Sequence, residues 1–211
     1  QHTVKKRTIK GCMPFLDTLT SGYLFKLPQD FGINHNYIHP KTLKRYSGFC
    51  PAIRSKRALD YININTSQLE AHPIEQLKGS PLIEKNKNLP FYKFLNPFII
   101  KTPPGYSCLF LSPMNNRDDR FEIIPGIVDT DTFEYEINFP FVINGDKYET
   151  LETVIERGTP IAQIIPFKRE SWEMEIEGKK NYTGYTLKGF QLYKKIINNY
   201  KTFLWRKKSW K

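Results

Sequence analysis

Cysteine is scarce in this 211-residue chain: Cys12, Cys50 and Cys108 are odd in number and lie far apart. No Cys-x-x-Cys pair occurs, so the sequence indicates neither a disulfide framework nor a zinc cluster. A chain of this kind is typical of a reducing compartment. We therefore expect a protein that holds its fold without disulfides.

Long hydrophobic runs and the signatures of the common enzyme classes are also missing. No stretch of about 18 apolar residues exists, so we expect no membrane span. No P-loop, Gly-x-Gly-x-x-Gly or Ser-His-Asp signature appears. His35 and His39 are four residues apart, but Pro40 would end a helix there. We interpret both histidines as exposed loop residues, and the sequence indicates no metal and no cofactor.

Acidic residues are absent from the last part of the chain, which makes the charge distribution uneven. The net charge is +11. Residues 1–10 contribute +4 and residues 188–211 contribute +8, so +11 less +12 leaves −1 for the residues between them. Basic ends are either solvated tails or contacts for nucleic acid or an acidic partner.

Aromatic residues and turn formers are abundant: the chain has 15 Phe, 12 Tyr, 15 Pro and 12 Gly. Phe and Tyr favour strands, and frequent Pro and Gly predict many turns. Short apolar segments at this density favour a β-rich sandwich or barrel over parallel βαβ units. Strands are predicted at residues 98–101, 107–111, 121–124, 133–143, 153–156, 161–167 and 172–176.

The patterns divide the chain into three parts. Residues 1–96 are predicted to be a mostly irregular region that wraps the core, with a short early helix, a strand at 23–27 and an irregular stretch at 34–60. Residues 97–177 are the predicted β core. Residues 178–211 are predicted to form a basic C-terminal helix and tail.

The C-terminal part changes to a helical period. Over residues 188–205 apolar side chains recur every three or four positions, with lysines between them, which predicts an amphipathic helix. An exposed apolar stripe would lower solubility, so we interpret this helix and the tail after it as an interaction element. Its candidate contact residues are Tyr193, Ile196, Ile197, Tyr200, Lys194, Lys195, Arg206, Lys207 and Lys208.

Residues 97–167 carry an ordered set of motifs. A Pro-Gly-Tyr turn at 104–106 leads into an apolar strand that ends on Pro113. Gly-Ile-Val-Asp follows at 126–129, and Gly-Thr-Pro-Ile-Ala-Gln closes the run at 158–163. This order and spacing resembles the core of the trimeric dUTPase and dCTP deaminase family. The resemblance implies a β-clip or jelly-roll barrel, with glycines 126 and 158 at turns, and a homotrimer.

The same resemblance suggests site residues. Asp129 matches the aspartate that activates the attacking water, and Gln163 and Gly126 match nucleotide-binding positions. The chain departs from the family pattern at Met114 and Asn115, which stand where the family has an Arg-Ser pair for the phosphates. The glycine that admits the pyrimidine ring is missing as well. We expect these departures to abolish hydrolysis of dUTP or dCTP.

Nearly the whole chain resembles a family of tailed-bacteriophage proteins without an assigned activity. The resemblance extends from CMPFLDTLTSGY near the start to WRKKSWK at the end. This resemblance implies a non-enzymatic structural or accessory role, through assembly with itself or with other phage proteins, in the virion or the host cytoplasm. Two alternatives stay open. One is a divergent pyrimidine-nucleotide hydrolase or nucleotide-binding protein that uses Asp129 and Gln163. The other is a protein that binds nucleic acid through its basic ends.

Overall fold

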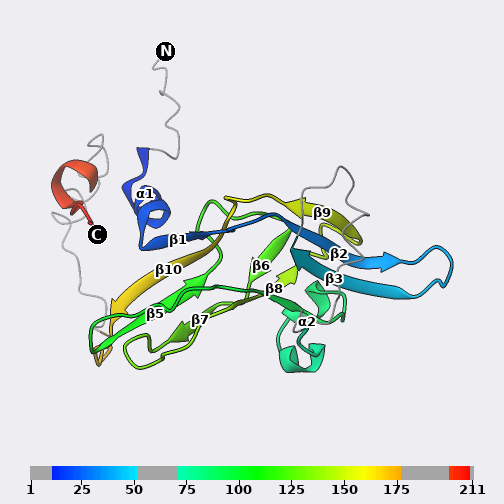
Figure 1. Ribbon diagram of the computed structural model, residues 1–211. Coiled ribbons are helices and arrows are strands. Elements are labelled where there is room, and N and C mark those ends of the chain that lie inside the picture. The colour runs from blue at the N-terminus through cyan, green and yellow to red at the C-terminus, as the bar shows by residue number, and fades with distance from the viewer. Residues whose placement is uncertain (1–10, 52–70, 177–199, 210–211) are drawn as a thin grey trace, which may run out of the picture. The chain divides into compact units, whose positions relative to one another are not determined.

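The aromatic and β-branched residues build three antiparallel sheets, which confirms the β-rich prediction (Figure 1). The structure is a computed structural model that describes residues 11–51, 71–176 and 200–209. The chain divides into two units: one is residues 22–168, and the other joins residues 1–21 to residues 169–211. None of the three sheets is closed on itself. Within the described residues, every helix is too short or too polar to span a bilayer.

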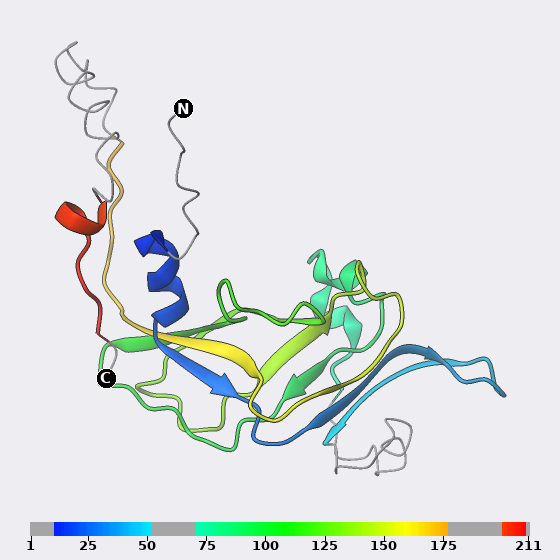
Figure 2. The same ribbon diagram turned by 90° about the horizontal axis from the view of Figure 1, so that it is seen from above.

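The first sheet holds the strands that carry the ordered motifs. Its strands, in spatial order, are β1 (Tyr23–Lys26), β10 (Pro160–Lys168), β5 (Tyr106–Leu111) and β7 (Gly126–Val128). Figure 2 shows β1 in blue beside β10 in yellow. Gly22 precedes β1 with φ +64°, and its Cα lies so close to the carbonyl oxygen of Ile164 that a side chain would collide with it. Glycine is therefore required where the chain enters this sheet.

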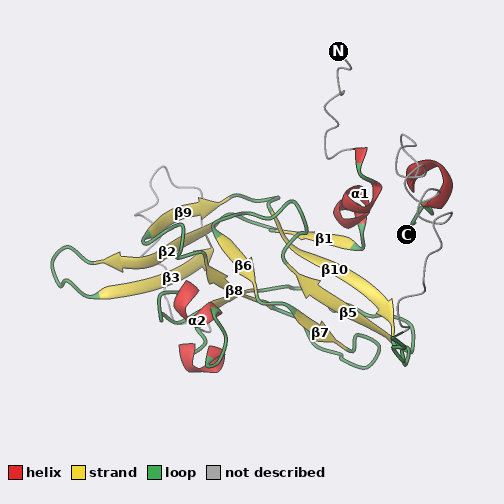
Figure 3. Ribbon diagram, turned by 180° about the vertical axis from the view of Figure 1, so that it is seen from behind, coloured by secondary structure: helices red, strands yellow, loops and turns green. Residues whose placement is uncertain are grey.

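The second sheet corrects the prediction of an irregular stretch at 34–60 over residues 34–51, and the rest of that stretch lies outside the described residues. Its strands, in order, are β3 (Arg45–Pro51), β2 (Phe31–Ile38) and β9 (Leu151–Ile155). Strands β2 and β3 form a long hairpin that extends away from the other strands of its unit (Figure 3). At its tip, backbone N–H groups of residues 41 and 42 donate to Nδ1 of His39. Strand pairing and this turn outweigh the low strand propensity of the polar residues.

The third sheet also has three strands. Its strands, in order, are β4 (Tyr92–Phe94), β8 (Phe139–Ile143) and β6 (Phe121–Ile123). Two short helical turns, η4 (Ile74–Leu77) and α2 (Leu82–Lys85), precede it in the chain. Strands β1 to β4 show that the region 1–96 is more regular than predicted.

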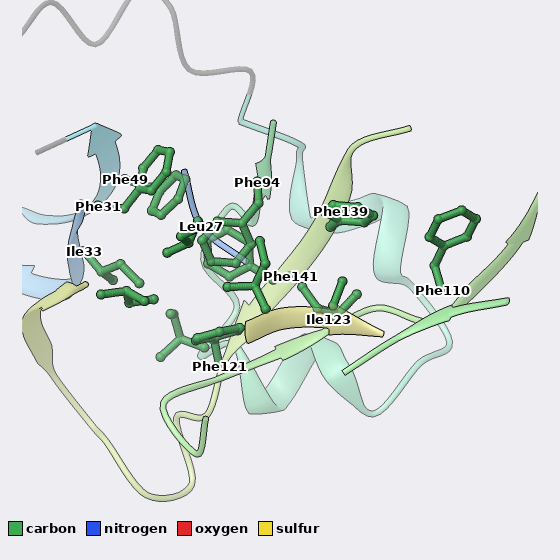
Figure 4. Close-up of a cluster of buried hydrophobic side chains, with 14 of the residues drawn as sticks. Leu27, Phe31, Ile33, Phe49, Phe94, Phe110, Phe121, Ile123, Phe139 and Phe141 are labelled. Carbon is green, nitrogen blue, oxygen red and sulfur yellow. The ribbon is translucent and has the colours of Figure 1, made fainter. Parts of the chain in front are cut away.

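Phenylalanines from all three sheets meet in one core (Figure 4). Phe94 stacks on Phe141 with ring centroids 4.2 Å apart, and Phe49 lies 5.0 Å from Phe141. Phe110 of β5 joins them through Phe139, at 5.9 Å. Each of these rings buries a large apolar area, so the aromatic cluster is what holds the three open sheets together.

Three predicted strands are absent or shorter than predicted. Residues 98–101 and 172–176 are not paired as strands, and of the segment 133–143 only the β8 part is a strand. Trp172 is 86% exposed. Alternating apolar residues form a strand only where a neighbouring strand takes their backbone hydrogen bonds, and the described residues provide none here. The predicted strands at 107–111, 121–124, 153–156 and 161–167 are confirmed within two residues at each end.

The unit made of both chain ends contains two short helices. Helix α1 (Met13–Thr20) confirms the predicted short early helix, and Pro14 lies in its first turn. The described end of the predicted C-terminal helix is η5 (Tyr200–Leu204), a single wide turn. Residues 188–199 of that prediction lie outside the described residues. Asp17 of α1 accepts hydrogen bonds from Nε1 of Trp205, at 3.0 Å, and from Nζ of Lys208, at 2.6 Å.

Candidate functional site

Asp129 follows directly after β7, at the edge of the first sheet. Its Oδ1 accepts a hydrogen bond of 2.6 Å from Oγ of Ser107, whose side chain is fully buried. Its backbone carbonyl accepts the N–H groups of Thr132 and Phe133, which closes a turn. Asp129 itself is exposed. The carboxylate therefore anchors the turn after β7 to β5, and its outer side faces solvent.

A second carboxylate strengthens the same connection. Oδ2 of Asp131 accepts the backbone N–H of Gly105 at 2.8 Å. Gly105 has φ +83° and forms the Pro-Gly-Tyr turn that the sequence indicated. The hydroxyl groups of Thr102 and Thr130 lie 2.7 Å apart beside it. These bonds show that Asp129 and Asp131 hold neighbouring turns in place. Among the described residues, no group of three His, Cys, Asp or Glu side chains is placed to hold a metal ion.

Gln163 lies in the middle of β10 with its side chain 1% exposed. Its Oε1 accepts the backbone N–H of Met114 at 2.8 Å, which fixes the loop that follows β5. A buried amide that already holds a backbone group loses a hydrogen bond if it turns toward a ligand. The geometry thus gives Gln163 a role in shaping this loop.

The two glycines of the motifs behave differently. Gly158 has φ +88° and lies in the turn before β10, as predicted. Gly126 is wrong as a turn prediction, because it is the first residue of β7 and pairs with Phe110. Pro125, immediately before it, ends the preceding segment. The chain passes from the third sheet to the first between β6 and β7, ahead of this glycine.

The structure does not bring Asp129 and Gln163 together. Gln163 pairs with Leu111 at the end of β5, whereas Asp129 bonds to Ser107 near its start. Four residues of strand separate these two positions, which is about 13 Å at the usual rise per residue. A single nucleotide-hydrolysis site built on both side chains would have to span that distance.

A cavity of about 470 Å³ lies at the loop after β5, and the sequence did not indicate it. Its lining includes Pro113, Asn115, Arg117 and Glu122. Glu122 is ion-paired with Lys85, and Arg117 is the one basic residue among the residues that line this cavity. Arg117 lies outside the sequence motifs, so the motifs gave no sign of this cavity. It became visible only from the position of the loop beside Gln163.

A second cavity of about 470 Å³ lies between the first sheet and residues 100–103. It is lined mainly by apolar groups and includes the side chain of Cys108. Burial raises the pKa of the Cys108 thiol, although a hydrogen bond from Thr130 acts in the opposite direction. A thiol with a raised pKa is a poor nucleophile, so Cys108 is a core residue.

Exposed apolar side chains gather on two adjoining segments, residues 95–101 and 129–136. We call this surface the acidic strip, because its charged residues are mostly Asp and Glu. Backbone N–H of Thr102 donates to the carbonyl of Thr130 at 3.3 Å, and Lys101 pairs with Glu134 at 3.3 Å, so the segments run side by side. Tyr135 is 72% exposed and its ring lies 5.6 Å from that of Phe133. The exposed apolar residues of the strip are Leu95, Phe98, Ile99, Phe133 and Tyr135.

The predicted C-terminal contact residues are described only in part. Tyr200, Arg206, Lys207 and Lys208 belong to the described residues, while residues 193–197 lie outside them. Arg206 and Lys207 are exposed. The side-chain hydrogen bond from Lys208 lowers the pKa of Asp17, and this effect outweighs the desolvation of that carboxyl. Lys208 thus stabilises its own unit, whereas Arg206 and Lys207 point their charges at solvent.

A scan against protein-family models gives no match for this sequence, and a search of curated proteins gives none either.

Proposed function

We propose that this chain is a non-enzymatic structural or accessory protein of a tailed phage that acts through assembly or partner binding. The acidic strip carries the proposal. Two of its apolar side chains, Phe98 and Tyr135, are 63% and 72% exposed. Adjoining exposed apolar residues of this size are typical of surfaces that bind another protein.

The arrangement of the motif-bearing strands supports a dUTPase-like β-clip or jelly-roll as the finer fold. Strands β10, β5 and β7 are neighbours in one sheet, although they are far apart in sequence. Each carries one of the three motifs. A homotrimer, in the virion or the host cytoplasm, is the assembly that accompanies this proposal.

Sedimentation velocity over a range of concentrations tests the proposal. We expect particles heavier than the 24.8 kDa chain, and we expect Phe98→Ser with Tyr135→Ser to return the protein to that mass. Leu43→Ser is the matched control, because Leu43 is 75% exposed at the tip of the β2–β3 hairpin, away from the strip. Mass spectrometry of purified virions provides the second arm. A 24.8 kDa species at every concentration, together with absence from virions, would contradict the proposal.

A pyrimidine-nucleotide hydrolase or nucleotide-binding protein is the second candidate, and the cavity at Arg117 favours it. A guanidinium in a cavity can pair with phosphate oxygens. We expect no turnover of dUTP or dCTP, since Asp129 lies about 13 Å along the sheet from Gln163. Turnover of dUTP or dCTP that disappears in Asp129→Asn would make the nucleotide hydrolase the first candidate function. A nucleotide that raises the melting temperature without turnover, and fails to do so in Arg117→Met, would support binding alone.

A further inference from the structure

We propose that the acidic strip binds the basic C-terminal residues around η5 of a second copy of this chain. The inference rests on the proposed function, because it names the partner of the same surface. It requires a surface held in one shape, a charge that contrasts with the rest of the chain, and a complementary element on the partner. The described residues provide all three.

The strip is held in shape by hydrogen bonds at its two ends, where each segment also bonds to a residue just beyond the other segment. At one end, backbone N–H of Asn96 donates to Oδ1 of Asn138 at 3.0 Å. At the other end, the bonds between Thr102 and Thr130 close the pair. The side chain of Asn96 also binds both backbone groups of Phe98, at 2.8 and 3.0 Å, which fixes that exposed residue. A surface ordered in advance loses less entropy when a partner binds.

The charge of the strip is opposite to that of the chain. Its acids are Asp129, Asp131, Glu134 and Glu136, and Lys101 is its one base, so −4 plus +1 leaves −3. The chain as a whole carries +11. A negative patch on a positively charged chain attracts basic segments and orients them as they approach.

The element of matching chemistry is η5 with the residues that follow it. Phe203 and Leu204 are 66% and 52% exposed. Arg206 and Lys207 add two exposed positive charges, and residues 188–211 contain no acid. Aromatic and aliphatic side chains beside basic groups complement aromatic and aliphatic side chains beside carboxylates. Burial of the apolar groups provides affinity, and the charges provide the register.

A second copy is the occupant that the chain itself supplies. Both surfaces are exposed in the single chain, and every copy carries both of them. Two copies can therefore exchange the contact reciprocally and form a closed dimer, or three copies can pass it around a ring. In each closed assembly, every copy has a partner for both of its surfaces.

Charge reversal in the full-length chain tests this contact. Variant one carries Glu134→Lys and Glu136→Lys, which changes the charge of the strip from −3 to +1. Variant two carries Lys201→Glu, Arg206→Glu and Lys207→Glu, which changes the charge of residues 200–211 from +5 to −1. In each variant the two surfaces have the same sign, so we expect the dissociation constant of self-association to rise at least about tenfold. A one-to-one mixture should associate again, because each surface then finds its opposite on the other variant.

The controls and contrary outcomes separate this contact from assembly in general. Lys78→Glu with Glu152→Lys reverses two exposed charges outside both surfaces, and it should associate like the wild type. Association that survives in both variants would overturn this contact and leave the assembly function standing. Variants that weaken without recovery in the mixture would overturn it too. A wild type that stays at 24.8 kDa would exclude the second copy, and the virion measurement would then decide the assembly function separately.

Discussion

His35 shows how a buried strand changes the chemistry of one residue. It lies in β2 with its side chain 2% exposed, which contradicts its interpretation as an exposed loop histidine. Its Nδ1 lies 3.3 Å from Oγ of Ser47, and its Nε2 has no hydrogen-bond partner among the described residues. Burial, together with a smaller effect of the positive charge of Lys87, lowers the pKa of His35 to about 4. The imidazole is therefore neutral at ordinary pH.

This lowered pKa predicts a loss of stability in acid. The unfolded chain takes up a proton at His35 near pH 6.5, and the folded chain does so only near pH 4. Between these values the unfolded state holds more protons, so the contribution is complete above pH 6.5 and is lost as the pH falls to 4. That loss is on the order of 3 kcal/mol. We expect His35→Gln to flatten the pH dependence of the free energy of unfolding in this window, measured by urea titration. An equally steep slope in His35→Gln would contradict the assignment.

At the scale of elements, sequence patterns predicted strands best where apolar residues continue without interruption. Strands β5 and β10 were predicted closely, because their residues are apolar on both faces and end at turn formers. The β2–β3 hairpin was missed because its polar residues are held by distant partners. The side chain of Asn36, for example, donates to the carbonyl of Glu149, 113 residues away. No local pattern contains such a contact.

The candidate site shows the same division. The Pro-Gly-Tyr turn and the exposed position of Asp129 follow from local residue types. The bond from Gln163 to Met114, and the cavity beside it, depend on the register of β10 against β5. That register is a property of the sheet, so the sequence indicated each residue without indicating how far apart they lie.

Arg120 links two of the open sheets. Its Nη1 donates to Oγ1 of Thr153 and to the carbonyl of Val154, both at 3.0 Å, and both acceptors belong to β9. Its Nη2 pairs with Asp118 at 2.6 Å, and this hydrogen bond raises the pKa of Arg120. The residue precedes β6, so the guanidinium ties the third sheet to the second.

Loss of this link should weaken the whole unit. We expect Arg120→Met to lower the free energy of unfolding by about 2 kcal/mol, because a charged, partly buried hydrogen-bond network is removed and the carbonyl of Val154 loses its donor. Arg117→Met is the matched control, since Arg117 lines a cavity at the surface, and it should change the free energy by less than about 0.5 kcal/mol. Urea unfolding followed by far-ultraviolet circular dichroism measures both. Equal effects of the two substitutions would show that Arg120 contributes only as an exposed charge.

At the scale of the whole molecule, charge and apolar core are separated along the chain. The buried residues of the main core all lie between Leu27 and Ile164, inside the unit of residues 22–168. The two basic ends, which together carry +12, belong to the other unit. All three tryptophans, at positions 172, 205 and 210, also belong to that unit. Tryptophan fluorescence therefore reports on the basic unit, and circular dichroism reports mainly on the sheets.

This separation predicts that residues 22–168 fold without the chain ends. The fragment retains the three sheets and the complete phenylalanine cluster, so it should give a β-type circular dichroism spectrum and one cooperative thermal transition. Residues 22–157 form the matched control: this fragment lacks β10, which lies between β1 and β5 and provides the buried Ile161 and Ile164. We expect it to melt without a cooperative transition, because the first sheet loses its central strand. A 22–168 fragment that melts as gradually as the control would show that the basic unit is required for the β fold.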